Sequence, residues 1–228
     1  SISVLKNKKY VYKDGGALWL ETSKFKDDKD RVILREDGSS TYFASDVSYH
    51  LDKRARGFDL LLNVLGSDHH GYVARLKAGL EAMDHPAECL EVILIQFVSL
   101  FRGNKKIQMS TRSGDFIPLM ELLDEVGKDA ARFFYVSRSN DQHLNFDLDL
   151  AKAKNNDNPV YYIQYAHARI HKVFQELSRN NFNFDKNSGI SNLGLLSINH
   201  ETEIITKLGD YPNIIELSAD NYSVHSLA

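Results

Sequence analysis

Apolar residues gather in two short runs, Phe58–Leu65 and Leu90–Leu100. Between them, Tyr72–Met83 places Tyr72, Leu76, Leu80 and Met83 on one stripe, the spacing of an amphipathic helix. Strand, helix and strand in about 40 residues make one βαβ unit with a right-handed crossover. The pattern predicts an α/β fold with a parallel sheet, in which Phe58–Leu65 is a strand buried on both faces.

Shorter elements are expected on either side of this unit. The predicted elements are strands at Ala17–Leu20 and Arg31–Arg35, a hairpin closed by Tyr42-Phe43, a helix over Ala44–Arg56 capped by Ser45, and helices over Glu121–Val126 and Asp129–Val136. Turn residues or glycines separate most of them, which favours short connections.

The last third of the chain has a helical pattern. Asp157-Asn158-Pro159 is typical of a helix start and predicts a helix to about Leu177. We expect a loop over Asn180–Gly194 and a short helix over Glu201–Leu208, ended by Gly209 and Pro212. The predicted divisions are a strand-rich part at 1–57, the βαβ part with its connecting helices at 58–152, and a helical part at 153–228.

Composition narrows the class of protein. Of 228 residues, 43% are hydrophobic and 26% charged, as in a folded globular protein. The net charge of −3 gives no general attraction for nucleic acid, so any RNA contact needs a local patch. The longest apolar run is too short to span a membrane. The single cysteine, Cys89, fits a cytoplasmic protein. We expect both ends to be cut, because the chain starts without Met and ends without a helix stop.

Gly66–Gly71 follows the first predicted strand of the parallel sheet, where α/β sheets bind ligands. Asp68 could accept hydrogen bonds from ribose, and His69 and His70 could donate to a carboxylate or phosphate. A plain turn with a capping Asp explains the residues equally well. Adjacent histidines point apart, so we expect no protein-bound metal; a metal-dependent hydrolase at Asp68-His69-His70 is the alternative.

Tyr42-x-x-x-Asp46 spans a predicted strand end and helix start, and both side chains can face one pocket if Tyr42 begins the turn. A carboxylate beside an aromatic ring suits a guanidinium. The simpler interpretation is an Asp in the first turn, beside the positive helix end.

Two further segments combine polar side chains with aromatic or cationic ones. Gln108–Gly114 follows Lys105 and Lys106 and suits a mobile loop over phosphates, or a solvated polar loop. Tyr161–Arg169 places four polar-tipped residue types on one helix, which suits core packing, a domain junction or an RNA backbone.

In order, these segments resemble bacterial arginyl-tRNA synthetase, a class I aminoacyl-tRNA synthetase. The blocks that carry the resemblance are Gly15–Leu20, Asp27–Arg31, Tyr42–Asp46, Gly66–Tyr72, Met109–Gly114 and Asn156–Ile170. The resemblance implies an internal fragment: the second half of a class I Rossmann-type catalytic domain, then the start of an α-helical anticodon-binding domain. It implies activation of L-arginine by ATP with Mg²⁺ to arginyl-adenylate, and transfer to tRNA(Arg), by a monomeric parent without membrane contact.

Site residues follow from the resemblance block by block. It implies arginine binding by Tyr42, Asp46 and His69, ATP binding by Gly66, Asp68 and His70, catalysis by Met109, Ser110, Thr111 and Arg112, and tRNA or domain-junction contacts by Asn158, Tyr162, Gln164, Tyr165 and Arg169. We expect the fragment alone to be inactive, because the His-x-Gly-His signature is absent.

The signature loop also departs from Lys-Met-Ser-Lys, since Gln108 and Thr111 stand where lysines are usual and Arg112 is the nearest cation. A non-catalytic nucleotide- or RNA-binding module is the alternative function.

Overall fold

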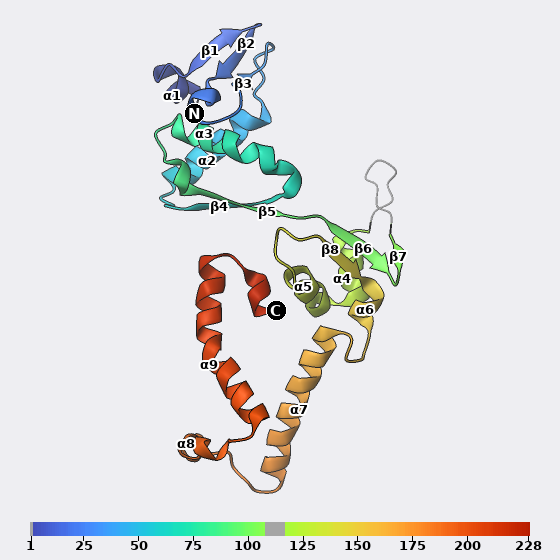
Figure 1. The fold of residues 1–228 in the computed structure, drawn as a ribbon. Coiled ribbons are helices and arrows are strands. Elements are labelled where there is room, and N and C mark those ends of the chain that lie inside the picture. The colour runs from blue at the N-terminus through green and yellow to red at the C-terminus, as the bar shows by residue number, and fades with distance from the viewer. Residues whose placement is uncertain (1, 108–116) are drawn as a thin grey trace. The chain divides into compact units, whose positions relative to one another are not determined.

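The computed structural model describes residues 2–107 and 117–228 and divides the chain into two compact units that meet in sequence at Phe97 and Val98 (Figure 1). The expected signature-loop residues Met109, Ser110, Thr111 and Arg112 lie outside the described residues. Each unit has its own hydrophobic core.

The first unit opens with a small antiparallel sheet. Helix α1 (Ile2–Asn7) leads into β1 (Val11–Asp14), β2 (Ala17–Leu20) and β3 (Arg31–Leu34), with the 3₁₀ turn η1 (Thr22–Phe25) between the last two. The predicted strands β2 and β3 are confirmed, whereas α1 and β1 were not expected. Leu20 and Ile33 point into the core and are almost fully buried.

The predicted βαβ unit is confirmed. Strand β4 (Leu61–Gly66), helix α3 (Val73–Glu81) and β5 (Leu90–Ile95) follow one another, with 3₁₀ turns η2 (Ser67–Tyr72) and η3 (Ala87–Cys89) at the connections. The two strands pair in parallel from Leu61↔Leu90 to Gly66↔Ile95.

The prediction that the first strand is buried on both faces is wrong. Strand β4 starts at Leu61 rather than Phe58, and the side chains of Leu62 and Val64 are 42% and 61% exposed. The cause is the alternation of a β-strand: Leu61 points into the core, so its neighbours along the strand point away from it.

Helix α2 (Tyr42–Ala55) packs against α3. It begins two residues earlier than expected, so Tyr42 is helical and does not close a hairpin. Its cap is Thr41 rather than Ser45, because the Thr41 hydroxyl accepts a hydrogen bond from the Ala44 amide. A Cβ on Gly79 would lie 2.5 Å from Val47 Cγ2, so the two helices approach closely where α3 carries a glycine.

The second unit starts with a three-stranded sheet in the order β7 (Lys105–Lys106), β6 (Val98–Arg102), β8 (Leu144–Asp147). Helices α4 (Leu119–Val126), α5 (Lys128–Val136) and α6 (Leu148–Lys152) supply its core with Leu122, Ala131 and Leu148. Helices α4 and α5 confirm the prediction, and Gly127 with φ +83° separates them.

The apolar run Leu90–Leu100 is two strands instead of one. It breaks at Gln96-Phe97, where the Gln96 side chain accepts hydrogen bonds from Ser67 Oγ and from the Phe97 amide.

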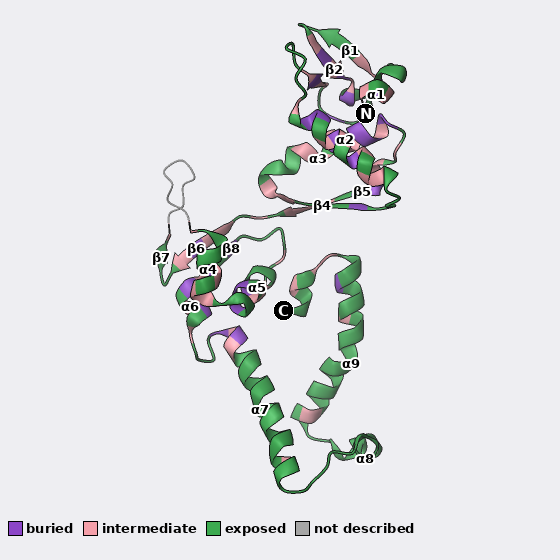
Figure 2. Cartoon of the chain, turned by 180° about the vertical axis from the view of Figure 1, so that it is seen from behind, coloured by how far each residue is buried: buried purple, intermediate pink, exposed green. Residues whose placement is uncertain are grey.

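Three helices form the rest of the chain: α7 (Pro159–Arg179), α8 (Lys186–Ser191) and α9 (Asn199–Asp220), with short 3₁₀ turns η4 (Leu193–Leu195) and η5 (Val224–Leu227). The start of α7 at Asn158-Pro159 is confirmed. In Figure 2 the surfaces of α7 and α9 are almost entirely exposed. Among the described helices none combines the length and hydropathy needed to cross a bilayer.

Two predictions in this part are wrong. The expected loop over Asn180–Gly194 contains α8, whose first amides bond to the Asp185 carboxylate. Helix α9 continues through Gly209 and Pro212. A proline inside a helix leaves the carbonyl four residues earlier without its donor, here that of the 68% exposed Leu208, which water can satisfy.

Candidate functional site

A cavity of about 630 Å³ in the first unit lies along α2, β4 and η2. Its polar and aromatic lining includes Tyr42, Asp46, His50, Asn63, His69 and Tyr72. Tyr42, Asp46 and His50 follow one another at a spacing of four residues, so α2 presents them on a single face. The structure therefore brings together the three residues expected to bind arginine, Tyr42, Asp46 and His69.

The Asp46 carboxylate is held by a tyrosine. The Tyr72 hydroxyl donates to Asp46 Oδ2 at 2.6 Å. Burial and this hydrogen bond raise the pKa of the Tyr72 phenol well above its ordinary value, so Tyr72 stays a donor at neutral pH. Tyr42, in contrast, is 85% exposed at the rim of the cavity.

A second hydrogen-bonded chain lies below Asp46. His50 is 4% exposed, and its Nδ1 lies 2.7 Å from the Asp46 carbonyl oxygen. Its Nε2 lies 2.7 Å from Asn63 Nδ2, and Lys53 Nζ donates to Asn63 Oδ1 at 3.3 Å. These partners favour the tautomer with the proton on Nδ1. The chain ties α2 to β4 beneath the cavity.

The strand-end loop begins at Gly66, which has an extended backbone. A Cβ on Gly66 would lie 2.5 Å from Asp68 Oδ1, so the Asp68 carboxylate folds over this residue. His69 Nε2 lies 3.8 Å from Asp68 Oδ2, and the His69 ring meets Tyr72 edge-on. The three loop residues expected to bind ATP do not line this cavity: they are Gly66, Asp68 and His70.

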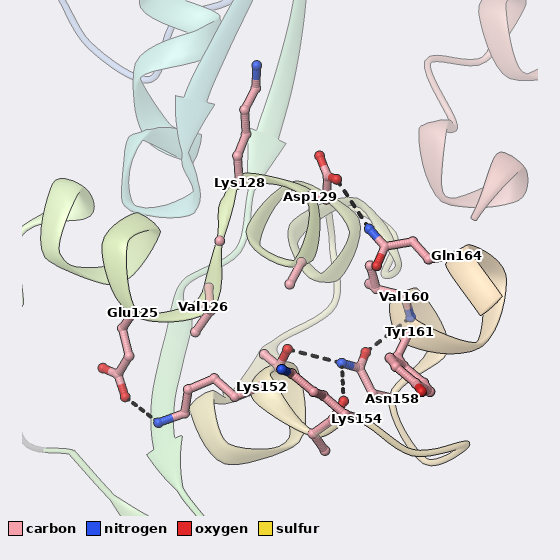
Figure 3. Close-up of a pocket in the computed structure, with 14 residues that line it drawn as sticks. Glu125, Val126, Lys128, Asp129, Lys152, Lys154, Asn158, Val160, Tyr161 and Gln164 are labelled. Atoms are coloured by element: carbon pink, nitrogen blue, oxygen red, sulfur yellow. Dashed lines mark hydrogen bonds and ion pairs between the residues drawn. The ribbon is translucent and has the colours of Figure 1, made fainter. Parts of the chain in front are cut away.

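Asn158 joins α6 to α7. Figure 3 shows its side chain between the two helices, where Oδ1 accepts from the Val160 amide and Nδ2 donates to the carbonyls of Ala151 and Ala153. Asn158 is 4% exposed. Its side-chain amide makes these three hydrogen bonds inside the protein, so Asn158 fixes the start of α7 against the end of α6.

The pocket in Figure 3 has a volume of about 550 Å³ and is lined in part by Lys128, Lys152 and Lys154. Glu125 neutralises one of them: its carboxylate pairs with Lys152 at 2.6 Å and with Arg102 at 2.6 Å. Hydrogen bonds from Arg102 and then Lys152 lower the pKa of Glu125 to about 2. Across the pocket, Gln164 Nε2 donates to Asp129 Oδ2 at 3.2 Å.

The other expected RNA-contact residues share a second cavity of the same unit, of about 840 Å³. Tyr162, Tyr165 and Arg169 line it together with Lys154. Tyr165 stacks on Tyr161 with ring centroids 6.3 Å apart, and the Arg169 guanidinium lies 5.6 Å from the Tyr165 ring. Exposed rings beside a guanidinium can stack on bases and pair with phosphates.

No group of three or more metal-ligating side chains occurs within residues 2–107 and 117–228.

Three residues of the first cavity, His50, Asn63 and Tyr72, were not identified from the sequence as part of a site. The four-residue spacing from Asp46 to His50 was a usable signal for His50. The contact of Tyr72 with Asp46 spans 26 residues and left no local signal.

Comparison with known proteins gives the family. Residues 1–155 match the catalytic domain of the class I tRNA synthetases (R), and residues 163–228 match the DALR anticodon binding domain. An arginine–tRNA ligase of Legionella pneumophila is 51% identical over the whole chain, and one of Hydrogenovibrio crunogenus is 53% identical over 96% of it.

A solved arginyl-tRNA synthetase structure from Campylobacter jejuni matches 99% of the chain with a TM-score of 0.86 at 36% identity. The chain spans 39% and 37% of the length of the two ligases and 48% of the Campylobacter chain. The expected fold, a class I α/β catalytic fragment with a parallel sheet followed by a helical anticodon-binding domain, is confirmed. The chain belongs to the class I arginyl-tRNA synthetase family.

Proposed function

We propose that the full-length protein is a cytoplasmic arginine–tRNA ligase. The carboxylate of L-arginine attacks the α-phosphorus of ATP, which enters with Mg²⁺, and pyrophosphate leaves. A ribose hydroxyl at the end of tRNA(Arg) then attacks the carbonyl carbon of arginyl-adenylate, and AMP leaves. The family match and the cavity that contains Asp46 support this proposal.

The observation that carries the arginine specificity is the position of Asp46. Its carboxylate lies in a partly closed cavity between aromatic side chains, Tyr42 at the rim and Tyr72 inside. A guanidinium binds carboxylate oxygens through two N–H groups and packs on aromatic faces. In this proposal Asp46 and Tyr42 bind the guanidinium, and His69 lies toward the amino-acid head group.

The remaining roles rest on the resemblance. Gly66, Asp68 and His70 contact the adenosine of ATP, and Met109, Ser110, Thr111 and Arg112 steady the triphosphate as pyrophosphate leaves. Tyr162, Tyr165, Gln164 and Arg169 meet the RNA backbone or the neighbouring domain, positioned by Asn158. The divisions at 1–57, 58–152 and 153–228 remain a prediction.

Arginine-dependent exchange of pyrophosphate into ATP tests the proposal, measured on the full-length protein with tRNA present. Asp46→Asn should raise the KM for arginine about ten- to a hundredfold, because a hydrogen bond to a charged group contributes about 1.5–3 kcal/mol. Asp52→Asn is the matched control: it lies on the same helix in an exposed pair with Arg56 and should leave KM unchanged. An unchanged KM in Asp46→Asn, or no exchange by the parent protein, contradicts the proposal.

A further inference from the structure

The contact between Asp46 and Tyr72 joins two elements that are distant in sequence. Asp46 lies in the second turn of α2, and Tyr72 is the last residue of η2, after the strand β4. The Tyr72 hydroxyl lies 2.6 Å from Asp46 Oδ2, the distance typical of a hydroxyl that donates to a carboxylate. In the part of the chain that the structure describes, no other side-chain donor reaches the Asp46 carboxylate.

Tyr72 is itself well fixed. Its ring packs against the core of the first unit, so the hydroxyl cannot swing freely. The Arg75 guanidinium lies 4.9 Å from the ring centroid, and the His69 ring meets its edge at a centroid distance of 6.2 Å. A donor held on this many sides stays in place before any ligand arrives.

We propose that Tyr72 is a positioning residue that orients the Asp46 carboxylate for the guanidinium of arginine. The hydrogen bond occupies Oδ2 and selects one rotamer of Asp46, which leaves Oδ1 for the ligand. Without it, the carboxylate samples other rotamers, and the substrate must order it on binding. This role rests on the proposed function, since it acts only if Asp46 binds arginine.

His50 supports the same arrangement from the backbone side. Its Nδ1 contacts the Asp46 carbonyl oxygen at 2.7 Å, and Asn63 holds the other ring nitrogen. The Asp46 carbonyl is therefore contacted by His50 of the same helix, which Asn63 of β4 holds in turn, and the Asp46 carboxylate is contacted from η2. The contact from Tyr72 can be removed without leaving a cavity in the core, because Tyr72→Phe deletes the hydroxyl and keeps the ring.

A double-mutant cycle in the full-length protein tests the role. Tyr72→Phe should raise the KM for arginine about three- to tenfold, because arginine must then order one free carboxylate side chain on binding, and change kcat less than twofold. In the Asp46→Asn background, Tyr72→Phe should change KM less than twofold, because the carboxylate is gone. Tyr10→Phe is the control: its ring packs on Phe25 at 5.0 Å, and it is outside the lining of the cavity.

The outcomes separate this role from the proposed function. If Asp46→Asn leaves KM unchanged, Asp46 does not bind arginine and both proposals fail. If Asp46→Asn raises KM but Tyr72→Phe does not, or if the two effects multiply, Tyr72 does not act through Asp46. Should Tyr72→Phe fail to fold, as judged by circular dichroism, Tyr72→Met takes its place in the same cycle, because this side chain is apolar, lacks the hydroxyl and can still pack on the core. A KM effect of Tyr72→Met that is the same with Asp46 present and in the Asp46→Asn background overturns the positioning role.

Discussion

Asp27 and Arg31 form the most buried ion pair described in the first unit. Both guanidinium contacts to the Asp27 carboxylate measure 2.8 Å, and the Asp27 side chain is 2% exposed. Burial alone would raise the pKa of Asp27, but hydrogen bonds from Arg31, Asp28 and Thr22 outweigh it and hold the pKa well below its ordinary value. The pair fixes the turn that leads into β3.

We predict that Asp27→Asn lowers the free energy of unfolding by about 1.5–3 kcal/mol at pH 7, because Arg31 loses the buried one of its two carboxylate partners and keeps only the exposed Asp28. A carboxyl group with a depressed pKa stabilises the fold above its unfolded pKa, 3.8 for Asp, and loses this as pH falls toward its folded pKa. The difference between the two proteins should therefore be constant from pH 7 to 5 and shrink below about pH 4. Urea unfolding at a series of pH values measures it; a difference as large at pH 2.5 as at pH 7 would contradict the linkage.

At the scale of elements, the close approach of α2 and α3 sets the geometry of the cavity. Val47, next to Asp46, is buried against Gly79 of α3, and helix α9 carries a glycine, Gly209, with open space around it. Both glycines are helical and lack a positive φ, so the two positions differ mainly in their neighbours.

Gly79→Ala should destabilise the protein by about 1–2 kcal/mol. The added methyl group overpacks the buried contact with Val47, and this cost exceeds the stabilisation from the higher helix propensity of alanine. Gly209→Ala, the matched control, should stabilise by up to about 1 kcal/mol. Val47→Ala should rescue Gly79→Ala, so that the double variant is more stable than the sum of the single effects predicts. Thermal unfolding of the four variants is compared with that of the unchanged protein. Equal shifts of Tm in Gly79→Ala and Gly209→Ala would show that the contact with Val47 is unimportant.

How far the fold follows from local pattern can be judged on the same elements. The βαβ unit and the start of α7 at Asn158 were predictable, because their signals lie within a few residues. The break at Gln96 was not, since its partner Ser67 is 29 residues away. Likewise, the spacing of Tyr42 and Asp46 predicted a shared pocket, whereas the contact of Asp46 with Tyr72 depends on how η2 returns to α2. The continuation of α9 through Pro212 was missed because the cost of a proline depends on whether water reaches the freed carbonyl.

At the scale of the whole molecule, the two hydrophobic cores share no residue. The proposed arginine cavity lies entirely in the first unit, and the proposed RNA surface lies entirely in the second. In the proposed function, the recognition of arginine and the recognition of tRNA are therefore divided between two units that each have their own hydrophobic core.

The 228-residue chain alone should show no arginine-dependent pyrophosphate exchange. It has no His-x-Gly-His stretch, so the cation and hydrogen-bond donors that this signature contributes at ATP are missing. The full-length parent, assayed in parallel with ATP, Mg²⁺ and tRNA, is the positive control. Exchange by the chain above the level of a no-arginine blank would show that the described residues complete the nucleotide site.

The amide of Asn158 has a consequence far from its own position. Helix α7 has 21 residues and so extends about 30 Å beyond this cap. If a helix of this length rotates by only about 6° at its first residue, its far end moves by about 3 Å, the length of a hydrogen bond. The three hydrogen bonds of the Asn158 side chain therefore determine the direction of the α7 axis within the second unit. In the proposed function, a substitution of Asn158 should therefore weaken RNA binding through the position of α7, with no contact to RNA removed.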